Sequence, residues 1–312
     1  MPKVAILSLD GPAGLDLAAF EAEFEMHWLW RAPDPEALLA RVGPSIRGLQ
    51  ATGGSPVDAA LIERLSALEI VACFGVGYDG VDLAAARRRG IVVTNTPGVL
   101  DDCVADLAIG LMIAACRGIA RGDRFVRSGG WLDGTLPLQR SMSRKRLGLL
   151  GLGRIGRAIA RRGGAFGMSI AYHARRRRED AAFDFCETPA ALAERSDFLV
   201  IATPGGAATR HLVDEAVLRA LGPEGILVNV ARGSVVDEAA LLRCLESGAV
   251  GGAGLDVFED EPRMSPGLRA RDDVVLVPHI GSATHETRAA MSRLTLENLR
   301  LHFAGEPVRT PV

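Results

Sequence analysis

The second half of the chain alternates short apolar runs with segments of helical periodicity. Apolar runs of strand length cover residues 147–150, 169–172, 198–202, 226–230, 252–257 and 274–278. The connections include helical patterns over residues 155–166, 214–221 and 238–247, the last of which begins with acidic residues and ends before Gly248. Short buried strands that alternate with helices predict a parallel, doubly wound α/β sheet.

The first half repeats this alternation more weakly. Its expected strands cover residues 4–7, 69–74 and 91–95, and its expected helices cover residues 35–42, 58–65 and 83–89. A long helical pattern over residues 101–127 follows Pro97 and Gly98, which end the last of these strands. We expect a final helix, residues 286–303, to return to the first half. The pattern therefore predicts two α/β domains with doubly wound parallel sheets, which suits a length of 312 residues.

Composition limits the partners of these domains. The formal net charge is −2, whereas proteins that bind nucleic acid carry a basic surplus, so we expect neither nucleic acid nor membrane as a partner. The five cysteines form no CxxC pair, which argues against a metal site or a disulfide framework and fits a reducing cytoplasm. The N-terminal residues lack the apolar region of a signal peptide, and the uncharged run 107–116 is too short to span a bilayer. We therefore expect a soluble, cytoplasmic protein.

A glycine-rich turn follows the first strand of the second half. In the sequence GLGRIG, Gly151 allows a tight turn, Gly153 lets the backbone approach a pyrophosphate, and Gly156 lets the following helix pack on the strand. The amino end of that helix favours the phosphate charge. Such turns also occur for purely structural reasons, but the position of this one between a strand and a helix favours dinucleotide binding.

The next strand ends in a run that lacks the acidic residue usually bound to the adenosine ribose. Ala174 stands near the place of that acid and is followed by four arginines. Without a carboxylate to repel a 2′-phosphate, Arg175 and Arg176 can bind one through paired, charge-assisted hydrogen bonds. The alternative is a solvated loop in an arginine-biased protein, because all but two of the 36 basic residues are arginines. We expect NADP binding by the first two arginines and assign Arg177 and Arg178 to solvent.

Three charged residues follow later strands. Arg232, Glu261 and His279 each lie after or at the end of an expected strand. Because ligands of open α/β sheets bind beyond the carboxyl ends of the strands, we expect these side chains to meet at one edge. Taken singly, each has an ordinary alternative as a surface charge, a loop residue or a hydrogen-bonded strand end. Their order and spacing favour a catalytic site through the family resemblance described next.

These segments together resemble the D-2-hydroxyacid dehydrogenase family, and in look they are closest to its NADPH-dependent glyoxylate and hydroxypyruvate reductases. The resemblance rests on FGVGYDGVD, GLGRIG, VNVARGSVVDE, GGAGLDVFEDEP and VPHIGSAT, and it covers nearly the whole chain. It implies that a Rossmann cofactor domain, residues 99–284, is inserted in a flavodoxin-like substrate domain, residues 1–98 and 285–312. The sequence pattern alone would divide the chain only once.

The resemblance also implies roles in reducing a 2-keto acid, which needs a hydride on C2 and a proton on the carbonyl oxygen. His279 would act as the general acid, and Glu261 would favour its charged ring and hold its orientation. Arg232 would bind the substrate carboxylate and polarise the ketone. The remaining substrate contacts that the resemblance implies are Val76, Gly77 and Ser282. The cofactor contacts that it implies are Gly151, Leu152, Gly153, Arg154, Ile155, Gly156, Arg175, Arg176, Thr203, Pro204, Val230, Ala231, Asp256, His279 and Gly281.

The expected activity is the reduction of a small 2-keto acid, glyoxylate or hydroxypyruvate, to the D-2-hydroxy acid, with NADP preferred and NAD possible. The alternatives are the reduction of hydroxyphenylpyruvate or another 2-keto acid, and a nucleotide-sensing corepressor without catalysis. A homodimer that pairs through residues 101–127 is expected from the apolar surface there and from the family. The role of Trp131 stays open, and the other histidines are assigned to structure or surface: His27, His173, His211, His285 and His302.

Overall fold

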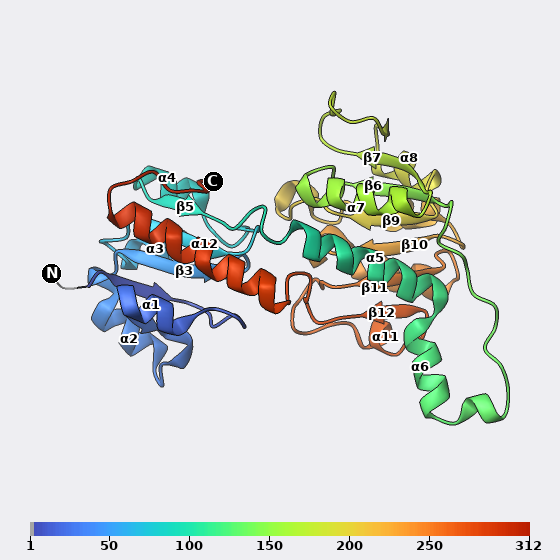
Figure 1. Cartoon of the computed structure of the whole chain (residues 1–312), viewed down its shortest axis with the longest axis horizontal. Coiled ribbons are helices and arrows are strands. Elements are labelled where there is room, and N and C mark those ends of the chain that lie inside the picture. Colours follow the sequence, from blue (N-terminus) through green and yellow to red (C-terminus); the bar gives the residue numbers. More distant parts are fainter. Residues whose placement is uncertain (1–2) are drawn as a thin grey trace. The chain divides into compact units, whose positions relative to one another are not determined.

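The computed structural model describes residues 3–312, which form two compact units. Unit 1 is formed by the chain up to Leu100 together with Ser282–Val312, and unit 2 is formed by Asp101–Gly281. In Figure 1 the red C-terminal helix lies among the blue elements of the N-terminal segment, so the chain returns to unit 1 at its end, as expected for the last helix.

Unit 1 contains a five-stranded parallel sheet with the order β2-β1-β3-β4-β5. This is the flavodoxin-like order. The strands are β1 (Ala5–Ser8), β2 (Glu25–Trp28), β3 (Gly48–Thr52), β4 (Ile70–Phe74) and β5 (Val92–Thr94). The helices are α1 (Leu17–Glu23), α2 (Pro35–Val42), α3 (Ala59–Arg64), α4 (Leu83–Arg88) and α12 (His285–Phe303), of which α12 packs on β4.

Unit 2 contains a seven-stranded parallel sheet with the order β12-β11-β10-β9-β6-β7-β8. The strands are β6 (Arg146–Leu150), β7 (Ser169–His173), β8 (Asp184–Phe185), β9 (Phe198–Ile201), β10 (Ile226–Asn229), β11 (Gly252–Leu255) and β12 (Val274–Leu276). The chain runs outward from β6 to β8 and then returns to the other side of β6 at β9. Such a reversal of strand order is where dinucleotide-binding sheets hold their ligand, and the glycine-rich turn follows β6.

The helices of unit 2 cover both faces of its sheet (Figure 1). They are α5 (Asp101–Arg117), α6 (Ile119–Arg127), α7 (Arg154–Ala165), α8 (Pro189–Glu194), α9 (Glu215–Leu221), α10 (Glu238–Glu246) and α11 (Pro266–Arg269). Most helices of the chain begin after an aspartate or threonine that accepts a backbone N–H of the first turn, which explains their starting points. These capping residues are Asp16, Asp34, Asp58, Asp82, Thr188, Asp214, Asp237 and Thr284.

The expected single helix over residues 101–127 is two helices. Gly118 adopts a left-handed backbone, φ 59°, that ends α5, and α6 continues after a bend of 59°. Helix α5 packs against α7, β10 and β11 and buries Ala108, Leu111 and Met112, so most of its apolar surface belongs to the core of unit 2. Within residues 3–312 no single helix is long and apolar enough to cross a membrane, and only α5 and α6 taken together pass on length and composition.

Candidate active site

The glycine-rich turn joins β6 to α7, and two of its glycines are required by the packing of the protein itself. A Cβ atom at Gly151 would lie 2.7 Å from the carbonyl oxygen of Ala202, and one at Gly156 would lie 2.3 Å from the carbonyl oxygen of Gly151. A Cβ at Gly153, in contrast, would meet no protein atom within 4 Å. The protein's own packing therefore does not explain Gly153, whereas close approach of a pyrophosphate does. The turn thus fits a dinucleotide.

The amino end of α7 provides the phosphate-binding surface that this turn needs. Gly153 is the N-cap residue and has no side chain to accept the first N–H groups of the helix, which leaves them for an anion. Leu152 is buried. Thr203 and Pro204 follow β9, the strand next to β6, and the Thr203 nitrogen would lie 2.9 Å from a Cβ at Gly151. These residues surround the same end of the sheet.

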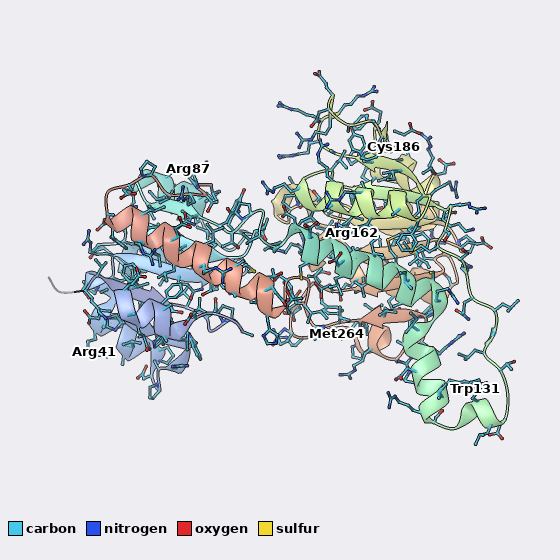
Figure 2. All side chains as sticks on the ribbon, viewed as in Figure 1. Arg41, Arg87, Trp131, Arg162, Cys186 and Met264 are labelled. Atoms are coloured by element: carbon cyan, nitrogen blue, oxygen red, sulfur yellow. The ribbon has the colours of Figure 1, made fainter. Side chains whose placement is uncertain are left out.

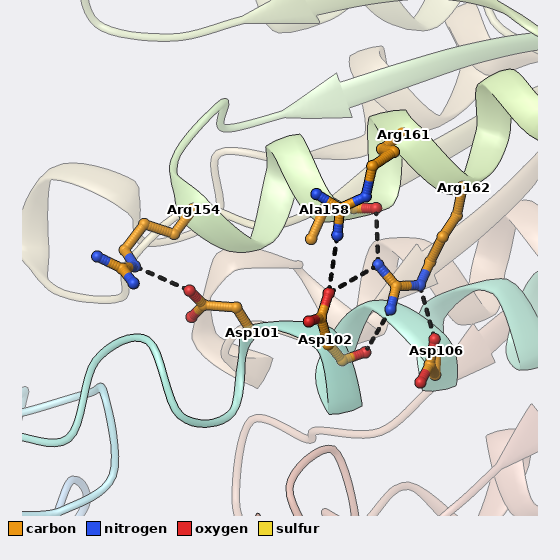
Figure 3. A network of polar contacts seen from close by, with 7 residues as sticks. All are labelled: Asp101, Asp102, Asp106, Arg154, Ala158, Arg161 and Arg162. Carbon is orange, nitrogen blue, oxygen red and sulfur yellow. Dashed lines mark hydrogen bonds and ion pairs between the residues drawn. The ribbon is translucent and has the colours of Figure 1, made fainter.

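Arg154, the first residue of α7, takes part in an ion-pair network between α5 and α7 (Figure 3). Its Nε donates to Asp101 at 2.8 Å. One turn or more further along α7, Arg162 bonds to Asp102 and Asp106, and Arg161 also bonds to Asp102. The network fixes α7 on α5 and neutralises part of the charge of Arg154. Ile155 lies in the first turn of α7.

The arginine run follows β7 in an exposed loop. The side chains of Arg175, Arg176, Arg177 and Arg178 are all exposed, and within residues 3–312 none of them forms an ion pair or a side-chain hydrogen bond. The nearby Asp180 is already paired with another arginine of α7, at 2.8 Å. Four guanidinium groups without a carboxylate partner therefore leave this loop with a local positive charge. The main chain of Arg178 bonds to the hydroxyl of Tyr172, but the four guanidinium groups are alike in their exposure.

His279 and Glu261 form a close pair beyond β12 and β11. The Nδ1 atom of His279 lies 2.7 Å from Oε2 of Glu261, while Oε1 accepts the backbone N–H of Phe258 at 3.1 Å. Burial raises the pKa of Glu261, but the hydrogen bond and charge of His279, the Phe258 amide and the charge of Arg232 together lower it below its usual value. An ionised carboxylate only accepts hydrogen bonds, so Nδ1 carries the proton and Nε2 is left for another partner.

The backbone of His279 adopts the left-handed region, with φ of 51°. Only a few per cent of non-glycine residues do so, and such outliers concentrate at functional sites. Two carbonyl groups, of Asp256 and Val277, accept its N–H at 2.9 and 3.1 Å and hold this conformation. With 49% of its side chain exposed, the imidazole is accessible to a small molecule.

Asp256 is a buried carboxylate that holds the segment after His279. Its two oxygens accept the N–H groups of Ile280, at 2.6 Å, and Gly281, at 2.9 Å. Burial raises the pKa of Asp256, against the effect of these two hydrogen bonds and of the nearby His279. Its position explains why Gly281 is small, since a Cβ there would lie 2.9 Å from the carboxylate. Contact of Asp256 with a nicotinamide stays a prediction, as does contact of Val230 and Ala231.

Arg232 follows β10 in a turn that packs against the segment bearing Glu261. A Cβ at Gly233 would lie 1.8 Å from the carbonyl carbon of Phe258, so only glycine allows the two segments to touch. Phe258 in turn donates to Glu261. Strands β10, β11 and β12 are neighbours, and the charge of Arg232 reaches Glu261. The structure therefore brings the three charged residues together at one edge of unit 2.

Unit 1 presents main chain at the carboxyl end of its own sheet. Val76 and Gly77 lie in the loop after β4, and the side chain of Asn95 donates to the Val76 carbonyl at 2.8 Å. The first residue of the second segment of unit 1, Ser282, accepts Nε of Arg288 with its carbonyl at 3.1 Å. Substrate contact by these residues stays a prediction.

Sequence reasoning missed Gly233 and Asn95, which carry no reactive group but hold the backbone of candidate site residues. The one available signal was position, because each follows or adjoins a residue at the end of an expected strand. His211 also pairs with a glutamate, Glu259, at 2.7 Å, and its backbone N–H donates to the carbonyl of Ser234 at 2.8 Å. In the part of the chain that the structure describes, no group of histidine, cysteine, aspartate and glutamate residues is arranged to hold a metal ion.

The chain matches known proteins over almost its whole length. Residues 109–281 match the family model described as D-isomer-specific 2-hydroxyacid dehydrogenase, NAD-binding domain. Glyoxylate/hydroxypyruvate reductase A of Arabidopsis thaliana is 46% identical over 94% of this chain and 93% of its own, and hydroxyphenylpyruvate reductase of Plectranthus scutellarioides is 44% identical over the same shares. A solved structure of an NADPH-dependent glyoxylate/hydroxypyruvate reductase from Sinorhizobium meliloti, in complex with NADP and malonate, has a TM-score of 0.91 and 43% identity and covers 99% of this chain and 97% of its own. By fold, by glycine-rich turn and by relatives, the chain belongs to the D-isomer-specific 2-hydroxyacid dehydrogenase family.

Proposed function

We propose that this protein reduces a small 2-keto acid, such as glyoxylate or hydroxypyruvate, to the D-2-hydroxy acid with NADPH. The observation that carries the proposal is the hydrogen bond between His279 Nδ1 and Glu261, 2.7 Å long, at an edge of the sheet that Arg232 shares. An accessible imidazole whose Nε2 can face a substrate is suited to act as a general acid. The named activities of the relatives from Arabidopsis and Sinorhizobium support the same class of substrate.

The residues of this chain have separate tasks in the proposed reaction. A bound nicotinamide supplies the hydride for C2. His279 gives its proton from Nε2 to the carbonyl oxygen as negative charge develops there, and Glu261 stabilises the imidazolium and holds the ring through Nδ1. Arg232 binds the substrate carboxylate with its paired N–H donors and so fixes the ketone relative to His279. The amides of Val76 and Gly77 are further candidates for carboxylate binding.

The preference for NADPH rests on the loop after β7. Arg175 and Arg176 follow Ala174, where an acidic residue would repel a 2′-phosphate, and their guanidinium groups have no carboxylate partner in the described residues. Charge-assisted, bidentate binding by arginine suits a phosphate. A relative described as NADPH-dependent supports this cofactor as well.

The experiment that tests the proposal follows cofactor oxidation with a panel of 2-keto acids. We expect turnover of glyoxylate or hydroxypyruvate with NADPH, faster than with NADH at equal concentrations, and an R-configured product from hydroxypyruvate. Hydroxyphenylpyruvate belongs in the panel because the Plectranthus relative is named for its reduction. Tight binding of NAD(H) without turnover of any keto acid would replace the proposal with a nucleotide-sensing role.

We also propose a homodimer, with an interface at α6, which lies within the expected residues 101–127, and at the segment after it. Helix α5 is packed into unit 2, whereas five of the large exposed apolar side chains lie on α6, the short helix η3 (Gly130–Leu132) and the segment after it. They are Ile119, Val126, Trp131, Leu132 and Leu138. Figure 2 labels Trp131 at the end of the extension that α6 and η3 form. Exposed apolar residues on one extension are typical of a protein interface. The cytoplasmic location stays a prediction.

Light scattering checks the dimer. We expect twice the chain mass of 33.0 kDa at micromolar concentration, and one chain mass after Leu132→Asp and Leu138→Asp are combined. Both side chains are fully or almost fully exposed, so these changes do not disturb the core of the monomer. A wild-type protein with the mass of one chain would contradict the proposal.

A further inference from the structure

Asn229, the last residue of β10, has a buried side chain, and among the described residues 3–312 it bonds only to the turn bearing Arg232. The residue is 1% exposed. Its Nδ2 donates to the carbonyl of Arg232 at 2.9 Å, and its Oδ1 accepts the N–H of Ala231 at 3.1 Å. One planar amide therefore closes the turn from both sides.

The backbone of Asn229 joins the same turn to the His279 side of the site. Its carbonyl accepts the N–H of Asp256 at 2.9 Å, and the carbonyl of Asp256 accepts the N–H of His279 at the same distance. A short, buried series of hydrogen bonds thus connects the Arg232 turn, through Asn229 and Asp256, with His279. Buried networks of this kind fix relative positions well, because every broken bond leaves a polar group without water.

We propose that Asn229 is a positioning residue that sets the direction of the Arg232 guanidinium and so the affinity for the substrate carboxylate. The inference rests on the proposed function of Arg232. It needs an amide in particular, since aspartate keeps the acceptor for Ala231 but turns a second acceptor toward the Arg232 carbonyl. A shift of the Arg232 turn displaces a long side chain by more at its end than at its base, and binding geometry tolerates little displacement.

The turn has other supports, so a change at Asn229 leaves unit 2 folded. The Arg232 carbonyl also accepts the N–H of Val235 at 3.2 Å, and Gly233 packs against Phe258. Loss of the Asn229 amide therefore loosens the turn rather than the sheet. This predicts a defect in substrate binding that exceeds the defect in stability.

The test is a double-mutant cycle between Asn229→Asp and Arg232→Lys, with KM for hydroxypyruvate and Kd for oxalate as readouts. We expect Asn229→Asp to raise KM and Kd about ten-fold, with kcat within about three-fold of wild type, as the loss of well-placed charge-assisted bonds implies. Arg232→Lys keeps a charge but not the paired geometry. In that background Asn229→Asp should change KM by less than about two-fold, because residues that act as one unit are not additive.

Gln50→Glu is the matched control. Gln50 is fully buried in β3 of unit 1, and its amide likewise donates to a backbone carbonyl, of Ala51, and accepts a hydrogen bond, from Ser8. The chemical change is the same, so both variants should lose thermal stability, but only Asn229→Asp should lose oxalate affinity.

Two results would overturn the inference: an unchanged Kd for oxalate in Asn229→Asp, or an equal loss with arginine and with lysine at position 232. Oxalate binding is measured by calorimetry on protein saturated with NADP and needs no turnover. If the wild type reduces no keto acid, the proposed function fails, and the oxalate measurement still decides the role of Asn229.

Discussion

The two units offer a ligand different kinds of group at the carboxyl ends of their sheets. Unit 2 carries charged side chains after its strands, Arg232, Glu261 and His279. Asn229 donates to the Arg232 carbonyl, Glu261 bonds to His279, and the Asp256 carbonyl accepts the N–H of His279. Unit 1 ends its strand β4 in main chain, with the Val76 carbonyl held by Asn95. Side chains carry acid–base chemistry and charge, whereas main-chain groups only donate or accept hydrogen bonds. This difference between the two units predicts that the substitutions that change the chemistry or the choice of cofactor lie in unit 2.

The largest effect tests whether His279 is the acid or merely a histidine paired with a glutamate. His279→Ala should lower kcat for keto acid reduction by about 10²- to 10⁴-fold, the contribution typical of a general acid. His211→Ala is the control within the same unit. His211 also bonds to a glutamate at 2.7 Å and also has a left-handed backbone, with φ of 50°. It lies between β9 and β10, however, and not after β10, β11 or β12. Equal losses of activity in the two variants would mean that such pairs serve the fold.

The next effect tests whether the charge of the loop after β7 selects the cofactor. Arg175→Ala and Arg176→Ala should each raise KM for NADPH about ten- to a hundred-fold, because each loses a guanidinium contact with a doubly charged 2′-phosphate. KM for NADH should stay nearly constant, since NADH presents a hydroxyl there. Ala174→Asp should move the preference toward NADH by adding a ribose acceptor and a phosphate repellent.

Arg177→Ala and Arg178→Ala are the controls for this loop. All four guanidinium groups are exposed and unpaired in the described residues, so we expect the four variants to have similar stability and to differ in KM for NADPH. Four equal values of KM for NADPH, or a wild type that prefers NADH, would reduce the run to a bias in composition.

The sequence predicted unit 2 more completely than unit 1, and particular residues explain why. Strand β3 was missed because Gln50 interrupts its apolar run, and Gln50 is acceptable there only because Ser8 of the neighbouring strand donates to it at 2.6 Å. Strand β2, with Glu25 and His27, is an edge strand without the expected pattern. Periodicity also ran across Gly118, where the backbone turns left-handed. Each miss depends on a contact or a dihedral angle that local pattern does not contain.

Some residues of the candidate site could be predicted from the sequence and others could not. Charged residues after strands could be found because their chemistry is visible in the sequence and strand ends share an edge. The residues that hold these side chains in place could not be found in the sequence. Gly233 is required by its contact with the backbone of Phe258, and Asn229 bonds to a turn that exists only in the folded protein. Arg154 was expected at the cofactor, and its pairing with Asp101 needed the packing of α7 on α5.

A smaller effect separates glycines that serve packing from the one attributed to a ligand. Gly156→Ala in unit 2 and Gly80→Ala in unit 1 should each cost about 1–3 kcal/mol of unfolding free energy, the usual penalty of overpacking. Their Cβ atoms would lie 2.3 Å from the Gly151 carbonyl oxygen and 2.2 Å from the Ser55 carbonyl oxygen. Gly153→Ala should keep the thermal midpoint of the protein without cofactor but weaken NADPH binding, measured by fluorescence, about ten-fold. A Gly153→Ala protein with full affinity would remove the pyrophosphate from this explanation.

The smallest effect concerns the pH dependence of Glu261→Gln. Burial raises the pKa of Glu261, but its interactions with His279 and Phe258 and the charge of Arg232 together lower the pKa by more than burial raises it. In the folded protein this pKa therefore lies below the usual glutamate value. A carboxylate with a lowered folded-state pKa stabilises the fold above its unfolded pKa, and this contribution is lost as the pH falls through the folded pKa. The difference in stability between wild type and Glu261→Gln should therefore be full at neutral pH and disappear in acid.

The rate should respond at the opposite end of the pH range. In the proposed reaction the imidazole of His279 donates the proton, and the Glu261 carboxylate accepts the hydrogen bond of its Nδ1, so glutamine should move the alkaline fall of kcat/KM to lower pH. At its optimum the variant should keep its rate within about ten-fold, because the imidazole itself remains. Pairing the two profiles separates the explanations: a stability difference that vanishes in acid without a shift of the rate profile would make Glu261 a structural partner of His279, whereas both changes together assign it to the proton donor of unit 2.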